Sequence, residues 1–262
     1  ADLIVKYRGT EALERLDDFS RAWQLRNKWK MDIELMLEIN TEYGPSDPAQ
    51  PEKRLSLDWR LADCHAIYWA IKGLRTAGEH EGYSIDEINT DRIIGHSLQN
   101  LFRNGRMYIQ KLKKEELSRY YKDAGIKREV YLRPDLRMFE SYNKAQLEII
   151  QKYRQKEKQG SSESLRIGHR NMLANAMFMF YQAGHQKKAR DIYRDLRIRY
   201  PHKGFEVSFT AYLKNRLREE LDMIGYRDAL EMVTALLRES YFRYAMGDDE
   251  EAFSREKMAL EV

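Results

Sequence analysis

Residues 164–201 constrain the fold of this chain most, because they predict two amphipathic helices joined by a tight turn. Apolar residues recur at three- and four-residue steps on both sides of Gly184. The second helix stops at Pro201, a residue that cannot continue a helix. Such a pair cannot bury both apolar faces by itself, so we expect neighbouring helices on either side. The apolar positions are Leu165, Leu173, Ala176, Met177, Phe180 and Tyr181 in the first helix, and Ala189, Ile192, Tyr193 and Leu196 in the second.

This hairpin resembles a tetratricopeptide repeat (TPR), a helix-turn-helix unit of about 34 residues. With Gly184 aligned on the turn glycine, Phe180 matches the large aromatic position and Ala189 the small position of the second helix. Tyr193 matches the aromatic position one turn later, and Pro201 matches the terminating proline. The departures are Leu173, Met177 and Leu196, which replace the motif's tryptophan, first-helix glycine and second small residue.

A weaker match to the same motif covers residues 236–260. Gly247 aligns with the turn, and Ala252 and Ala259 follow it, but Arg243 and Glu256 stand where the motif has aromatic residues. The resemblance implies an all-α fold, in which antiparallel helix pairs stack as a TPR-like right-handed solenoid with a less regular N-terminal half. The polar stretch 156–164 is the best internal boundary. We therefore predict an N-terminal helical region over residues 1–158 and a TPR-like region over residues 159–262.

The periodicity predicts helices along nearly the whole chain. The alternating runs, such as residues 4–7 and 129–132, are too short to build a sheet. A proline-rich loop is expected over residues 43–57. Capping-box spacing over residues 84–87 marks a helix start. The expected helices cover residues 10–40, 61–77, 84–112, 134–156, 205–224, 226–246 and 248–260.

Aromatic and charged residues gather around the helix at 61–77. Trp59, Arg60 and Tyr68 are residue types that often anchor protein interfaces, so they are candidate partner-binding residues. The alternative is that the aromatic side chains belong to the core and that Asp58 caps the helix with Arg60 as its partner. The sequence alone leaves both interpretations open.

The composition excludes several classes of function. The chain has 262 residues, a net charge of +4 and one cysteine, Cys64, which excludes an internal disulfide framework and a cysteine-rich zinc site. It contains no nucleotide-binding loop, metalloprotease motif or calcium loop, and its histidines lack metal-ligand spacing. Residues 95–99 have Gln99 where a hydrolase nucleophile elbow requires glycine. We expect no enzymatic activity, cofactor, metal or membrane-spanning segment.

The resemblance to TPR proteins implies a non-catalytic scaffold that binds a peptide or partner protein on a concave helical surface. By that resemblance, the exposed first-helix positions that contact the partner are Asn171, Asn175, Phe178 and Gln182. The alternative is a helical-repeat RNA-binding protein that uses basic clusters, the strongest of which spans residues 187–203. A third hypothesis is an all-α enzyme that uses His65 or His96.

The two ends of the chain lead to two further expectations. The chain begins at Ala1 without a methionine, which indicates a processed or truncated N-terminus of a soluble domain whose compartment is unknown. The C-terminal helix ends at Val262 with nothing polar to seal its apolar side, which favours continuation of the chain or self-association.

Overall fold

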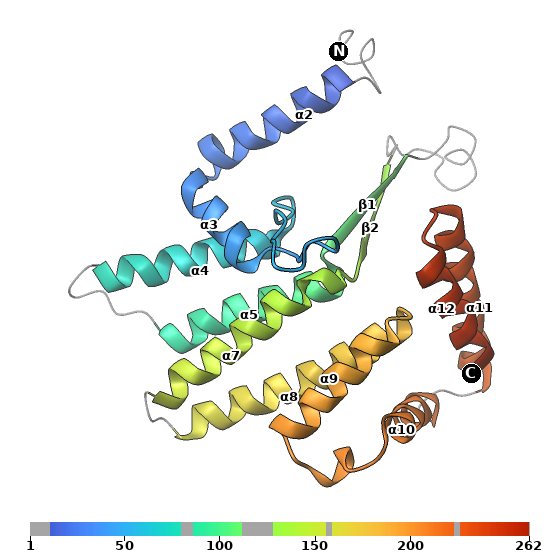
Figure 1. The fold of residues 1–262 in the computed structure, drawn as a ribbon. Helices are drawn as coiled ribbons and strands as arrows, with labels where there is room; N and C mark the ends of the chain where they lie inside the picture. Colours follow the sequence, from blue (N-terminus) through green and yellow to red (C-terminus); the bar gives the residue numbers. More distant parts are fainter. Residues whose placement is uncertain (1–10, 80–85, 112–127, 156–158, 223–225, 262) are drawn as a thin grey trace. The chain divides into compact units, whose positions relative to one another are not determined.

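The computed structural model describes residues 11–79, 86–111, 128–155, 159–222 and 226–261 (Figure 1). The described chain is mostly helical, which confirms the predicted helical character, and it adds one two-stranded sheet. It divides into two compact units, residues 1–145 and 146–262. The division falls within one helix, while the predicted boundary after Lys158 lies among residues outside the description and stays a prediction.

The first predicted helix is wrong, because the segment 10–40 contains a break. Helix α2 (Glu11–Trp23) runs into a π-helical turn, η1 (Gln24–Lys28), and α3 (Ile33–Tyr43) starts afresh. Lys30 has a left-handed backbone with φ 54°, which a continuing right-handed helix forbids. Asp32 then caps α3 by accepting a hydrogen bond from the Leu35 amide at 2.9 Å.

The core of the N-terminal unit lies between α4 (Ala62–Glu79) and α5 (Glu87–Asn104) and against the start of α7 (Phe139–Gln155). The predicted loop at 43–57 is confirmed, with one bridge between Ser46 and Arg54. Asn40 in α3 fixes this loop by accepting a hydrogen bond from the Leu57 amide at 3.0 Å. The largest fully buried side chains of the unit are those of Ile39, Ile67, Tyr68, Leu98 and Met138.

Helix α5 ends at Asn104 rather than at the predicted residue 112, and a β-hairpin follows it. Strands β1 (Arg106–Lys111) and β2 (Arg128–Arg133) pair antiparallel, with Tyr108 opposite Tyr131. The expectation of no sheet was therefore wrong, because the short alternating run at 129–132 finds its partner in residues that sequence periodicity assigned to the helix. A short 3₁₀ turn, η2 (Leu136–Met138), leads into α7.

The C-terminal unit is built from helices throughout its described residues (Figure 1). Helices α8 (Gln159–Gln182) and α9 (Gln186–Arg199) form the predicted hairpin, and α11 (Tyr226–Ala245) and α12 (Asp249–Glu261) form a second one. Between them lie η3 (Lys203–Phe205) and α10 (Phe209–Asp222), which begins four residues later than predicted because residues 203–205 form the separate turn. The apolar positions of the first hairpin are buried except Tyr181, which is half-buried; the fully buried ones include Leu173, Met177, Ala189 and Leu196. Within the described part of the chain, no helix combines the length and apolar character that crossing a membrane requires.

Candidate functional site

The turn between α8 and α9 determines where the last residues of α8 lie. Gly184 has φ 82°, a left-handed conformation that costs glycine little, and it reverses the chain between the helices. The turn is closed by the His185 amide, which donates to the Phe180 carbonyl at 2.9 Å. Ala189 of α9 is fully buried and α9 packs along α8, so the C-terminal turn of α8 is supported by the second helix of the hairpin.

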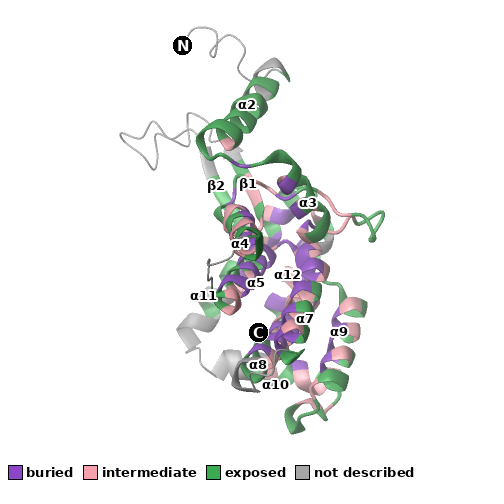
Figure 2. Cartoon of the chain, turned by 90° about the vertical axis from the view of Figure 1, so that its left-hand side faces the viewer, coloured by how far each residue is buried: buried purple, intermediate pink, exposed green. Residues whose placement is uncertain are grey.

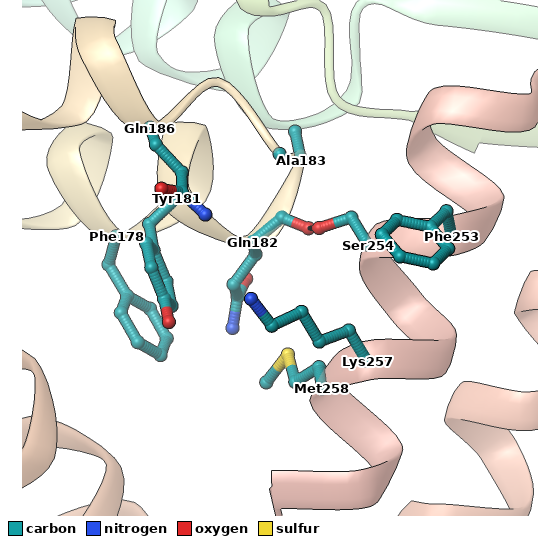
Figure 3. Close-up of a pocket in the computed structure, with 10 residues that line it drawn as sticks. Phe178, Tyr181, Gln182, Ala183, Gln186, Phe253, Ser254, Lys257 and Met258 are labelled. Carbon is teal, nitrogen blue, oxygen red and sulfur yellow. Dashed lines mark hydrogen bonds between the residues drawn. The ribbon is translucent and has the colours of Figure 1, made fainter.

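A pocket of about 310 Å³ lies between this end of α8 and helix α12 (Figure 3). Ser254 of α12 fixes one side of it by donating a hydrogen bond to the backbone carbonyl of Gln182. That carbonyl is one of the last four carbonyls of α8, and these receive no hydrogen bond from an amide of the same helix. The lining residues are Phe178, Tyr181, Gln182, Ala183, Gly184, Gln186, Phe253, Ser254, Lys257 and Met258.

The lining combines apolar walls with a few polar groups. Phe178 and Met258 are buried and form the apolar walls of the pocket. Phe253 also lines it, and its side chain is 63% exposed. In Figure 3 the side chains of Gln182 and Lys257 extend from opposite helices toward each other. Among the described residues that line the pocket, Lys257 carries the only charge. The pocket therefore suits an apolar group with an adjacent hydrogen-bonding or anionic group.

The four first-helix residues implied by the resemblance lie in different environments. Gln182 lines the pocket and is half-buried, and Asn171 is exposed elsewhere on α8. Asn175 is also half-buried and accepts a 3.4 Å hydrogen bond from Arg216 of α10. Phe178 was expected to be exposed and is not, since only 7% of its surface is accessible. It lines the pocket together with residues of α12.

The candidate residues of the N-terminal unit also separate into two groups. Trp59 and Arg60 line a second cavity, of about 580 Å³, together with Arg21, Trp29 and His65. Tyr68 is completely buried, and its hydroxyl accepts a hydrogen bond from the Asp32 amide at 2.7 Å. The interpretation of Tyr68 as a partner-contacting residue is wrong, because its ring is part of the core.

Arg60 is held by a carboxylate inside its own loop. Its Nε donates to Asp58 at 2.7 Å, so Arg60 is the partner of Asp58, as the alternative interpretation expected. The Asp58 carboxylate also accepts from the Arg60 amide, which lies before the first residue of α4, so the expected capping of the helix by Asp58 stays a prediction. Burial raises the pKa of Asp58, but hydrogen bonds from the Arg60 side chain and backbone outweigh burial and place the pKa below its usual range. A ligand in the second cavity would have to compete with this ion pair for the guanidinium.

Backbone carbonyls are the hydrogen-bond partners of Cys64 and His65, and His96 lies at the surface. Cys64 is buried, its thiol hydrogen-bonds the Asp58 carbonyl at 3.2 Å, and burial raises its pKa. His65 Nε2 lies 2.8 Å from the Trp59 carbonyl, and His96 is exposed on α5. In the described part of the chain, no three His, Cys, Asp or Glu side chains lie close enough together to hold a metal ion.

Sequence reasoning missed the half of the C-terminal pocket that α12 supplies. Lys257, Met258 and Ser254 lie more than one helical hairpin away from Gln182 in the sequence, and no local motif links them to it. The sequence feature that pointed to α12 was Gly247. This glycine has φ 72° and forms the turn that brings α12 back along α11. Comparisons of this chain with protein-family models, with curated proteins and with solved structures found no match.

Proposed function

We propose that this chain is a non-catalytic interaction scaffold whose C-terminal unit binds a peptide segment of a partner protein. The observation that carries the proposal is the pocket between α8 and α12, with its apolar walls and its single lysine. The peptide would insert one large apolar side chain beside Phe178 and Met258. An acidic side chain or a terminal carboxylate of the peptide would lie near Lys257.

The size of the pocket limits how much affinity it can supply. A volume of about 310 Å³ accommodates one large side chain rather than a folded element. Burying such a side chain contributes about 1.5–3 kcal/mol, whereas a micromolar complex requires about 8 kcal/mol. The peptide must therefore continue along the surface of α8, where Asn171 is exposed and Gln182 is partly accessible.

The helical-repeat arrangement is part of the same proposal. Both hairpins turn at a glycine with positive φ, Gly184 and Gly247, and both bury the small residue that follows in the second helix, Ala189 or Ala252. Repeats of the TPR family bind peptides with first-helix residues, and α8 is the first helix of the better-matching hairpin. We extend that role to α8 of this chain.

The test begins with selection of peptides from a random phage-displayed library on the immobilised full chain. A selected peptide is then labelled and titrated by fluorescence anisotropy. We expect selected sequences to place an aromatic or large aliphatic residue beside Asp, Glu or the C-terminus. Lys257→Glu should weaken binding about tenfold, because repulsion replaces attraction at an exposed position.

Two further variants distinguish a loss of binding at the pocket from a general effect of charge and from a loss of folding. Lys214→Glu makes the same change at an exposed residue of α10 outside the pocket and should leave the affinity unchanged. Asn175→Ala combined with Gln182→Ala should weaken peptide binding and change the melting temperature little. Ser254 contacts only the backbone of Gln182, and the hydrogen bond that Asn175 accepts from Arg216 is long, at 3.4 Å. Equal effects of Lys257→Glu and Lys214→Glu would contradict the proposal, as would a large fall in the melting temperature of the double variant.

A further inference from the structure

Helix α2 presents an apolar stripe to solvent. Leu16, Phe19 and Trp23 are 55%, 66% and 55% exposed, and their spacing places them within about 60° of one another around the helix axis. The described residues of α2 are green along its length in Figure 2, which marks them as exposed. Three large apolar side chains on one exposed stripe of a surface helix are typical of an interaction surface.

The helix also needs a partner for its own stability. Its 13 residues continue into the five residues of η1, and isolated helices of about this length are marginal in water. Its described ion pairs, Arg15 with Glu11 at 2.6 Å and Arg21 with Asp18 at 3.6 Å, are exposed and contribute little. Packing of the apolar stripe is the contribution that would fix α2 in place.

Charge along α2 and η1 identifies the partner. Residues 11–18, EALERLDD, carry four carboxylates and one guanidinium, whereas residues 21–30, RAWQLRNKWK, carry four cations and no carboxylate. Two such segments repel each other when parallel, because like halves then meet. When antiparallel, each acidic half lies beside the other copy's basic half, so the segment is complementary to itself.

We propose that two copies of this chain associate through antiparallel α2 helices. Phe19 of each copy lies next to the two-fold axis, and Leu16 of one copy packs against Trp23 of the other. The first turn of one helix, with Glu11, lies beside Arg26 and Lys28 of the other. This interface is independent of the peptide pocket in the C-terminal unit.

Sedimentation equilibrium of the full chain between about 1 and 100 μM tests the apolar contact. We expect a reversible dimer, and Phe19→Glu should weaken it at least a hundredfold while circular dichroism shows the fold retained. Leu260→Glu is the matched control, because Leu260 is an 82% exposed apolar residue on α12, where the sequence favoured self-association. A monomeric wild type, or dissociation by Leu260→Glu rather than Phe19→Glu, would overturn the proposal.

Charge exchange tests the electrostatic complementarity of the two segments, and crosslinking tests the direction of pairing. Glu11→Lys with Asp18→Lys makes the segment more basic, and Arg26→Glu with Lys28→Glu makes it more acidic. Each double variant alone should lose most dimer, and a mixture of the two should restore a heterodimer. Oxidation of a mixture of Arg15→Cys and Ala22→Cys chains should give mixed disulfides faster than either chain alone, since the native Cys64 is buried. Failure of the mixtures to associate or to crosslink would reject the antiparallel interface.

Discussion

His169 is the residue whose environment most changes its chemistry. It is completely buried in α8, and its Nδ1 lies 2.6 Å from the hydroxyl of Tyr200, the C-cap residue of α9. Burial lowers its pKa from 6.5 to about 4; the nearby Arg199 adds to this effect, and Asp195 opposes it. The neutral imidazole therefore holds together the open end of the hairpin, opposite the turn at Gly184.

The lowered pKa of His169 predicts that the C-terminal unit loses stability in mild acid. Because the pKa is lower in the folded state, the stabilisation is complete above pH 6.5 and is lost as the pH falls toward about 4. Between pH 7 and pH 5 the free energy of unfolding should fall by roughly 2 kcal/mol from this residue. Urea denaturation followed by far-UV circular dichroism measures the change.

Two variants separate the titration of His169 from its packing. His169→Gln removes the titrating group, so its unfolding free energy should depend less on pH between 5 and 7 than that of the wild type. Tyr200→Phe removes the hydroxyl but leaves the histidine buried, so it should keep most of the wild-type pH dependence. An unchanged pH dependence in His169→Gln would show that other groups control the acid sensitivity.

At the scale of elements, the presence of most helices was predictable from the sequence, and the residues at which they end were not. The hairpin α8–α9 and the turns at Gly184 and Gly247 followed from apolar periodicity and glycine placement. The break in the segment 10–40 did not, because the left-handed residue is Lys30 and no glycine or proline marks it. Strand β1 was assigned to the preceding helix. It is a strand because it pairs with β2, which lies further along the chain, and the local sequence of β1 does not reveal that pairing.

Gly247 and Gly168 should respond to alanine in opposite directions. Gly247 has φ 72°, and an added Cβ would meet no atom within 4 Å, so only the backbone conformation opposes alanine. Gly247→Ala should therefore destabilise the chain by roughly 1–2 kcal/mol. Gly168 lies inside α8 with the same free space and a helical backbone, so Gly168→Ala should stabilise it by about 0.5–1 kcal/mol. Urea midpoints of the two variants check the signs, and changes of equal sign would refute the backbone explanation.

At the scale of the whole molecule, the sequence could indicate a helical surface but not the pocket. Phe178 and Gln182 were identified through the resemblance of α8 to a repeat helix, yet the opposite wall comes from α12. Its position follows from the packing of α12 on α8 and from the hydrogen bond of Ser254 to Gln182. The sequence pattern of a helix does not show which distant helix it packs against, so Lys257 and Met258 could be found only from the structure.

Whether the basic cluster at 187–203 can bind phosphate depends on the residues that contact its side chains in the folded structure. Arg194 pairs with Asp191 at 2.9 Å, and Arg199 donates to both oxygens of Asp195 at 2.8 Å. The guanidinium groups of Arg190 and Arg197 lie over the rings of Phe209 and Tyr193, at 5.7 and 5.9 Å from the ring centres. A phosphate backbone would compete with carboxylates and aromatic rings for these four side chains.

This competition predicts weak binding of polyanions with a shallow salt dependence. If about three phosphates are neutralised, log K for single-stranded RNA should fall with log salt at a slope near −2. Titrating labelled poly(U) with the full chain at several salt concentrations measures that slope. A slope of about −4 or steeper would mean that most of the cluster contacts phosphate, which favours the RNA-binding alternative. Arg190→Glu with Arg197→Glu should then abolish RNA binding, whereas under the peptide proposal it leaves the affinity for a selected peptide unchanged, because neither residue lines the pocket.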